Sequence, residues 1–248
     1  MIYEDDLTNI LCKFISIINK FPIQSKNNNS NEFGLLMEKM LGLSNNSLPI
    51  ADYNSFEIKC MKQESKYALK LFSLNISYID SNDNNYLIKN FYTLKGNKMS
   101  FNHSFFATKY TKIGKNNYGK LLIDFNSKKI ILKIYDSNYK CIHDTSYWDV
   151  NELYKRINSK LTKIVFIEYY TKFRDKKKYY YLNSIDFLQL KSVDTFIELL
   201  KSGKIFINTS ITSTNNKNID IIKNHGFGFM IDYSNINCLY DSIKKINI

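Results

Sequence analysis

Cysteine is scarce in this chain, and its four copies lie far apart. Cys12, Cys60, Cys141 and Cys238 form no Cys-x-x-Cys pair. This spacing argues against a zinc ribbon. Unclustered thiols of this kind are typical of a reduced, cytosolic protein, so we expect a cytoplasmic location.

The chain also lacks a long apolar run, since none approaches the roughly 20 residues that a membrane-spanning helix needs. Glu4, Asp5 and Asp6 stand where a secretion signal would carry basic residues, so we expect no signal peptide. The 248 residues are 44% hydrophobic and 23% charged. This composition is typical of a globular protein with one large domain or two lobes.

Arginine is nearly absent, and Arg156 and Arg174 are the only two. The net charge of +12 therefore comes from lysine, and it is unevenly distributed. Residues 1–60 carry five basic and seven acidic side chains, residues 61–140 carry fourteen and five, and residues 141–248 carry sixteen and eleven. A basic body around an acidic segment suits an enzyme that acts on nucleic acid, although a general lysine bias would also give plain solvated surface. With so little arginine, Lys, Asn, Gln or His would do most of the base reading.

Residues 34–59 are the most informative stretch. They predict a helix with Glu38 in its middle and Gly42 just past its end. The expected apolar face of that helix consists of Leu35, Leu36, Met37, Met40 and Leu41. A polar loop over residues 44–47 follows and leads through Pro49 to Asp52 and a strand that begins near Phe56.

The strand places two charged side chains on one face. Because side chains alternate along a strand, Glu57 and Lys59 point the same way and Ile58 points the other. Asp52 precedes Glu57 by five residues and could fold back beside it. Two carboxylates with a neighbouring lysine suit Mg²⁺, which would hold a phosphate while the lysine orients the attacking water. An exposed Glu and Lys on an ordinary strand would give the same short pattern.

The whole stretch resembles the core of the MvaI/BcnI restriction endonucleases and of the related MutH-type mismatch-repair nickases. In these proteins a Gly-x-x-x-Glu-x-x-Leu-Gly helix precedes a Pro-Asp strand and Glu-x-Lys. The matching positions here are Gly34, Glu38, Leu41, Gly42, Asp52, Glu57 and Lys59. Pro49 departs from the pattern because it lies three residues before Asp52. The resemblance implies catalytic roles for Glu38, Asp52, Glu57 and Lys59, with Asp52 and Glu57 as the metal ligands.

A second match lies near the C-terminus and resembles the MvaI/BcnI relatives but not MutH. These have a His-Gly-x-x-Phe-Arg-Ile segment whose histidine faces the bases, and His225, Gly226 and Phe229 fit it. Met230 replaces the usual arginine, while Asn208 and Ser210 stand where Asp and Arg are favoured. These departures concern base preference. A structural role for His225 is the alternative.

Further elements follow from periodicity and turn residues. Helices are expected over 3–20, from an N-cap at Asp149 to about Leu161, over 193–202 with Gly203 at the end, and after the strand at 223–231 as far as 246. Expected strands include 67–74, paired with the Glu57 strand, a hairpin of 119–125 with 129–135, and 164–170. The remaining candidate DNA contacts are Ser73, His103, Lys109, Lys112 and Lys115.

We therefore expect an α/β, restriction-endonuclease-like (MutH-like) fold, with a mixed sheet flanked by helices and a smaller β-rich recognition lobe. Residues 1–80 and 148–200 would form the catalytic lobe, and residues 81–147 and 201–248 the DNA-recognition lobe. The expected function is Mg²⁺-dependent, sequence-specific hydrolysis of double-stranded DNA. A cognate DNA methyltransferase would belong to the same restriction-modification system, and a monomer is one of the open oligomeric states. The alternatives are a MutH-like site-specific nickase and a non-catalytic DNA-binding module.

Overall fold

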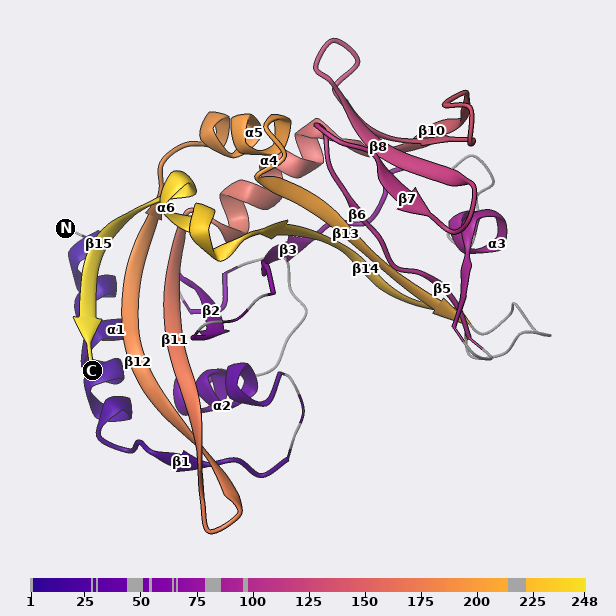
Figure 1. Ribbon diagram of the computed structural model, residues 1–248. Helices are drawn as coiled ribbons and strands as arrows, with labels where there is room; N and C mark the ends of the chain where they lie inside the picture. Colours follow the sequence, from indigo (N-terminus) through magenta and orange to yellow (C-terminus); the bar gives the residue numbers. More distant parts are fainter. Residues whose placement is uncertain are drawn as a thin grey trace. The chain divides into compact units, whose positions relative to one another are not determined.

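A computed structural model describes residues 2–27, 29, 31–43, 51–53, 55–63, 65, 67–78, 86–95, 98–213 and 222–248 (Figure 1). For residues 2–5, 94–95, 98 and 222–225 it describes the course of the backbone alone. The chain divides into two compact units. The first comprises residues 1–67, 157–191 and 240–248, and the second comprises residues 68–156 and 192–239. The assignment of catalysis to one lobe and recognition to the other stays a prediction.

The first unit is a mixed sheet with two helices. Its strands run in the order β1-β12-β11-β2, and β15 also pairs with β12. The β2–β11 pair is parallel, whereas the other pairs are antiparallel. The elements are α1 (Ile2–Ile18), β1 (Ile23–Gln24), α2 (Glu32–Met40), β2 (Glu57–Lys62), β11 (Lys163–Arg174), β12 (Lys177–Leu190) and β15 (Tyr240–Asn247).

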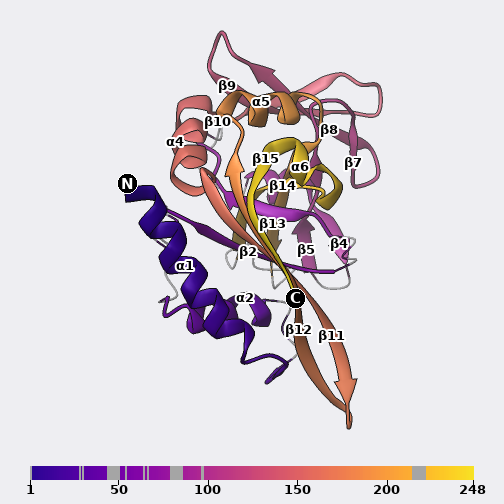
Figure 2. The same cartoon turned by 90° about the vertical axis from the view of Figure 1, so that its left-hand side faces the viewer.

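One hydrophobic core joins α1 and α2 to this sheet. Figure 2 shows the two helices beside the sheet strands β11 and β12. Helical spacing brings Ile10, Phe14 and Ile17 to one side of α1, and these side chains are 0–1% exposed. Phe14 and Phe56 each meet Phe187 of β12 edge to face, with ring centroids 5.9 and 6.0 Å apart. The core thereby fixes the beginning of β2 against the helices.

The start of α2 is held by a network of hydrogen bonds to Glu32. The Glu32 carboxylate accepts hydrogen bonds from the hydroxyls of Ser25 and Tyr180 and from the backbone amides of Lys26 and Asn27. Burial opposes ionisation, but these donors outweigh it and lower the pKa of Glu32 to about 2. The network ties α2 to β12 and so positions the helix that carries Glu38.

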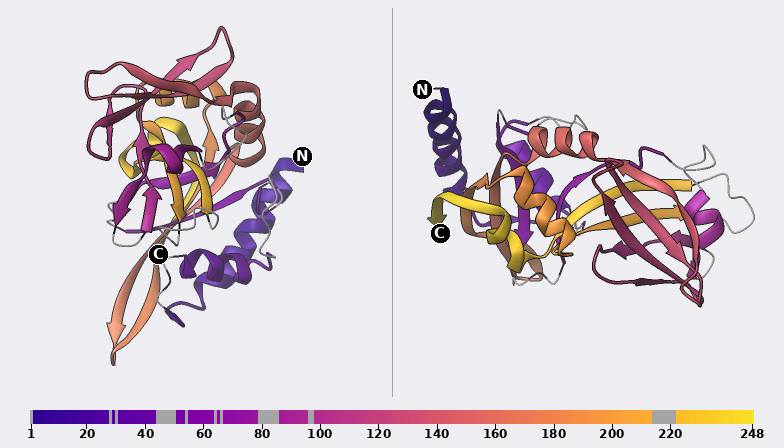
Figure 3. Two further views of the ribbon diagram at one scale, coloured as in Figure 1. Left: turned by 90° about the vertical axis from the view of Figure 1, so that its right-hand side faces the viewer. Right: turned by 90° about the horizontal axis from the view of Figure 1, so that it is seen from above.

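The second unit contains two antiparallel sheets (Figure 3). One has the order β10-β9-β8-β7, and the other has the order β3-β14-β13-β5-β4, with β6 also paired to β13. The strands are β3 (Leu69–Ser73), β4 (Thr93–Lys95), β5 (Lys98–Phe101), β6 (Ser104–Phe105), β7 (Thr111–Ile113), β8 (Asn117–Asp124), β9 (Lys129–Tyr135), β10 (Cys141–Asp149), β13 (Ile205–Ser213) and β14 (Ile222–Ile231). The helices are α3 (Tyr86–Phe91), α5 (Val193–Lys201), η1 (Tyr233–Asn235) and α6 (Ile236–Leu239), while α4 (Val150–Lys160) begins in this unit and ends in the first.

Several local predictions are confirmed. Asp149 accepts hydrogen bonds from the amides of Asn151 and Glu152, at 2.7 and 3.1 Å, and so caps α4. Gly42 and Gly203 follow α2 and α5 with φ of +77° and +74°, the left-handed conformation that ends helices. The hairpin of β8 with β9 is also present. These features depend on a few neighbouring residues, which is why the sequence predicts them.

Two longer-range predictions are wrong. The expected C-terminal helix is only the single turn of α6, and residues 240–247 form β15 instead. The edge of β12 offers unpaired backbone groups, and pairing with it satisfies the backbone of β15. The strand after β2 does not pair with it: β3 pairs with β14, where Phe72 stacks on Phe229 at 4.9 Å.

One smaller expectation also needs correction. Leu35 is 40% exposed, whereas Leu36, Met37, Met40 and Leu41 face the core as expected, together with Phe33. The polar loop at 44–47 and Pro49 lie outside the described residues.

All four cysteines are described, and all are free thiols. Within the described part of the chain, no helix combines the length and the apolar character needed to cross a bilayer.

Candidate active site

Strand β2 carries the two charged residues on one side and an apolar residue on the other. Ile58 belongs to the core beneath α1 and α2. Glu57 and Lys59 meet on the opposite side, where Lys59 Nζ lies 2.7 Å from Glu57 Oε1. The side chains of Glu57 and Lys59 are 6% and 14% exposed. The predicted alternation along this strand is confirmed.

Asp52 returns to this strand through a tight turn. Tyr53 and Phe56 exchange two backbone hydrogen bonds, of 2.9 and 2.7 Å, which reverse the chain between Asp52 and β2. The Asp52 carboxylate then accepts a hydrogen bond from the amide of Ile58 at 3.0 Å. The expected return of Asp52 to the Glu57 strand is therefore confirmed.

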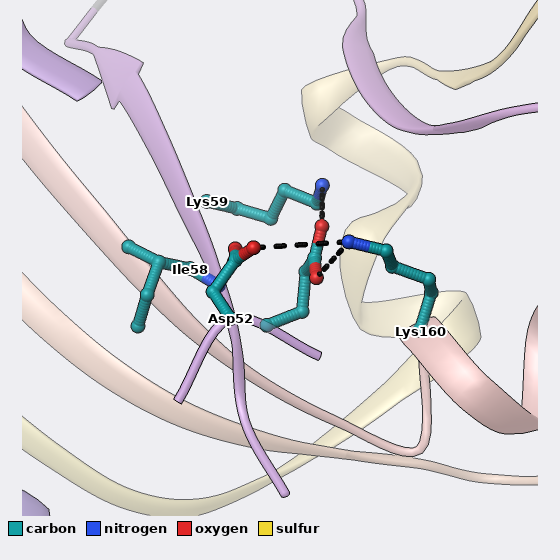
Figure 4. Close-up of polar contacts among 5 residues, drawn as sticks. Asp52, Ile58, Lys59 and Lys160 are labelled. Atoms are coloured by element: carbon teal, nitrogen blue, oxygen red, sulfur yellow. Dashed lines mark hydrogen bonds and ion pairs between the residues drawn. The ribbon is translucent and has the colours of Figure 1, made fainter. Parts of the chain in front are cut away.

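The site contains a second lysine, Lys160, which the sequence analysis did not predict. Lys160, the last residue of α4, places its Nζ 3.0 Å from Glu57 Oε2 and 3.7 Å from Asp52 Oδ1 (Figure 4). Parallel pairing aligns Ile164 of β11 with Glu57, so the end of α4 arrives directly beside the carboxylates. Finding Lys160 in advance would have required knowledge of that pairing.

Glu38 lies on α2 and lines a hollow of about 340 Å³. The hollow is lined by Asn31, Gly34, Leu35, Glu38, Ile58, Cys60 and Tyr169. Ile58 and Cys60 point away from the face of β2 that carries Glu57 and Lys59, so Glu38 approaches the strand from its other side. Burial raises the pKa of Glu38, and the negative charges of Asp52 and Glu57 raise it further.

The donor set fits a small divalent cation. Mg²⁺ prefers carboxylate oxygen and is usually held by one or two carboxylates, with water completing its shell. Asp52 and Glu57 supply such a pair, and the ammonium of Lys160 already acts as a stand-in cation in contact with both. Among the described residues no group of three His, Cys, Asp or Glu side chains could hold a metal. The structure thus brings together two acidic ligands and not three.

The candidate DNA contacts lie in the second unit. Lys109, Lys112 and Lys115 are all exposed around β7, and Lys109 Nζ lies 4.0 Å from the centroid of the Phe106 ring. His103 is less accessible, because its ring packs against Phe101 at 5.1 Å. Within the described part of the chain, its Nε2 has no hydrogen-bond partner, and burial lowers the pKa of the ring.

Ser73 and the segment of His225 are neighbours in one sheet. Ser73 ends β3 opposite Gly228 of β14. Gly226 has φ of +81°, and a Cβ placed on it would lie 3.6 Å from Ser73 Cβ. His225 is therefore one residue from a left-handed glycine on the same strand, while its side chain lies outside the described residues. The DNA-contacting roles of these residues stay predictions.

The comparisons with known proteins agree with this arrangement. Residues 11–240 match the model of the MvaI/BcnI restriction endonuclease family. Restriction endonuclease MvaI in complex with its cognate DNA substrate is similar, with a TM-score of 0.81, 21% identity and coverage of 94% of this chain and 96% of that one. MvaI in the absence of DNA is also similar, with a TM-score of 0.58, 22% identity and coverage of 97% of each chain. No curated protein matches the chain. The expected restriction-endonuclease fold is confirmed.

Proposed function

Because this chain belongs to the MvaI/BcnI restriction endonuclease family, we propose that it is a Mg²⁺-dependent, sequence-specific endonuclease of restriction type that cuts double-stranded DNA. The observation that carries the proposal is the contact of Asp52 and Glu57 with one shared cationic group, beside Lys59 on β2. MvaI itself was solved with its cognate DNA substrate. That likeness supports duplex DNA as the substrate.

Each side chain of the site has a distinct role in this proposal. Asp52 and Glu57 would hold Mg²⁺, which supplies Lewis-acid polarisation of a phosphate oxygen when bound. The backbone amide of Ile58 fixes one oxygen of Asp52 and so leaves the other for the metal. Lys59 is held at 2.7 Å from Glu57, where its ammonium would orient the attacking water and offset the negative charge that develops on the phosphate.

Glu38 would act from the other side of β2. Burial and the charges of Asp52 and Glu57 raise its pKa, and the described residues contain no group of three His, Cys, Asp or Glu side chains that could hold a metal. We therefore place Glu38 as a positioning residue behind the two ligands.

Recognition would be the task of the second unit. His225 would contact base edges, with Ser73 on the paired strand β3 and His103 between β5 and β6 as further DNA contacts. The exposed Lys109, Lys112 and Lys115 would bind phosphates. A cytoplasmic location and a partner DNA methyltransferase in the same restriction-modification system complete the proposal.

Plasmid cleavage tests the function directly. Supercoiled plasmid incubated with the purified protein should become linear with Mg²⁺ and stay intact with EDTA. A nicked circle as the only product would favour the MutH-like nickase. Intact plasmid under every metal condition, with retained DNA binding, would favour the non-catalytic module. Sequencing the ends of digested phage DNA would then give the recognition site and the cut position.

A further inference from the structure

The position of Lys160 carries a consequence for metal binding. Its Nζ contacts Glu57 Oε2 at 3.0 Å and Asp52 Oδ1 at 3.7 Å, while Lys59 contacts the other Glu57 oxygen at 2.7 Å (Figure 4). The side chains of Lys160, Glu57 and Asp52 are 14%, 6% and 23% exposed. Two largely buried carboxylates are thus bridged by one ammonium group.

Such a bridge is needed when no metal is bound. Two carboxylates in a poorly solvated place repel one another, and neither is stable there without a compensating positive charge. Lys160 supplies that charge from the end of α4, and a cation is favoured at a helix C-terminus. The bridge therefore stabilises the arrangement of Asp52 and Glu57.

The same bridge conflicts with a metal ion. Mg²⁺ takes its carboxylate oxygens at about 2.0–2.1 Å, and the oxygens available to it are those that Lys160 contacts. An ammonium and a divalent cation on the same two oxygens would repel each other strongly in this buried setting. Lysine carries its charge on a flexible four-carbon stem, so it can leave without moving its helix.

We propose that Lys160 is an internal counter-cation, which holds the Asp52–Glu57 pair together in the metal-free enzyme and leaves it when the metal binds. This inference rests on the proposed function, because it takes Asp52 and Glu57 as the metal ligands. Lys160 is then a positioning residue of the free site. Its released ammonium remains near the site, where the negative charge of a DNA phosphate is the complementary partner.

Metal affinity distinguishes this competition from an ordinary structural ion pair. Mn²⁺ serves as the probe, and free Mn²⁺ is counted by electron paramagnetic resonance at fixed pH without DNA. The affinity of Lys160→Met for Mn²⁺ should be at least about tenfold higher than that of wild type, which is within the usual range of coupling between two binding events. Lys160→Arg should stay near wild type. The matched control is Lys155→Met, an exposed lysine on the same helix, which should change nothing.

Thermal melting gives a second readout. In EDTA, Lys160→Met should melt below wild type, because two carboxylates lose their shared counter-charge. With Mn²⁺ the difference in melting temperature between the variant and wild type should shrink or change sign, because the metal restores that charge and binds the variant more tightly. An ordinary structural ion pair would give the same loss in both conditions, which would overturn the inference.

Wild-type protein alone provides a test if Lys160→Met fails to fold. Lysine acetylation with acetic anhydride, read by peptide mass spectrometry, should label Lys160 weakly in EDTA and several-fold more with Mn²⁺. Labelling of Lys155 should not depend on the metal. Equal labelling of Lys160 in both conditions would overturn the inference.

The outcomes separate this inference from the proposed function. Wild type that binds Mn²⁺ and loses it in Asp52→Asn, with unchanged or weaker binding in Lys160→Met, refutes the role of Lys160 and leaves the metal site intact. Wild type that binds no Mn²⁺, or that binds it as well as Asp52→Asn does, refutes the metal site and the inference together.

Discussion

The charged residues around Glu57 and the lysines around β7 use charge in opposite ways. Lys59 and Lys160 are 14% exposed, and each is fixed on one oxygen of Glu57. Lys109, Lys112 and Lys115 are exposed to solvent. A charge that must act on one bond needs a fixed, poorly solvated position, because electrostatic interactions are strong there. A charge that attracts a long polyanion needs only to be accessible.

The largest effect on cleavage is expected from the charged residues around Glu57. Asp52→Asn or Glu57→Gln should lower Mg²⁺-dependent cleavage by about 10³-fold or more, because each removes one of two metal ligands and with it several kcal/mol of transition-state stabilisation. Lys59→Ala should behave alike. The rate of plasmid cleavage is the measurement, and Glu198→Gln, an exposed acid of α5, is the control. Near-normal cutting by either carboxylate variant would disprove the site, while DNA binding in Ca²⁺ should survive in all of them.

Changes to the exposed lysines around β7 should alter DNA affinity and not the cleavage step. Changing Lys109, Lys112 and Lys115 together to Glu should flatten the dependence of log affinity on log salt by about 0.9 for each DNA phosphate that the protein no longer neutralises. The charge-matched control changes Lys155, Lys244 and Lys245, all exposed. Binding is measured by anisotropy across a salt series in Ca²⁺. Equal slopes in the two triple variants would mean that bulk charge, and not this loop, binds DNA.

His225 should affect specificity alone. His225→Ala should lower the ratio of cognate to non-cognate affinity. The expected loss of discrimination is roughly 1–3 kcal/mol, the usual effect of removing a hydrogen bond to a base edge. Both affinities are measured in Ca²⁺ on a variant whose melting temperature is unchanged. A structural histidine would instead lower the melting temperature and weaken both affinities together. An unchanged ratio in a folded variant would limit the C-terminal resemblance to architecture.

The smallest effect is expected at Glu38, as a dependence of stability on pH. Burial and the charges of Asp52 and Glu57 raise its pKa above the ordinary value of 4.5. A raised pKa means that folding favours the protonated form, so this stabilisation is complete below the ordinary pKa and is lost as pH rises through the folded one. In EDTA, Glu38→Gln should therefore melt higher than wild type at pH 8, by no more than about 4 °C, and not at pH 4. A gain that is equal at both pH values would contradict the role of the Glu38 charge.

The cleavage rate of Glu38→Gln, compared with that of Asp52→Asn, tests whether Glu38 is a metal ligand. A positioning residue behind the ligands should cost clearly less activity than Asp52→Asn. An equal loss would make Glu38 a metal ligand.

The wrong predictions share a physical cause. Residues 240–247 become β15 because β12 has a free edge, and β3 leaves β2 because Phe72 packs on Phe229 of β14. In both cases a partner distant in sequence decided the conformation. Local patterns carry no information about such partners, so the sequence could not distinguish these outcomes.

The sequence by itself determined the features that depend on near neighbours. The two-residue period of a strand places Glu57 and Lys59 together, a short turn returns Asp52 to them, and the Asp149 side chain caps the helix that follows it. Tertiary structure decided what completes the site. Lys160 is 103 residues from Glu57 and reaches it because β11 pairs with β2 in parallel. The close approach of these charges depends on a long-range pairing that folding establishes, since no periodicity in the chain encodes which strands become neighbours.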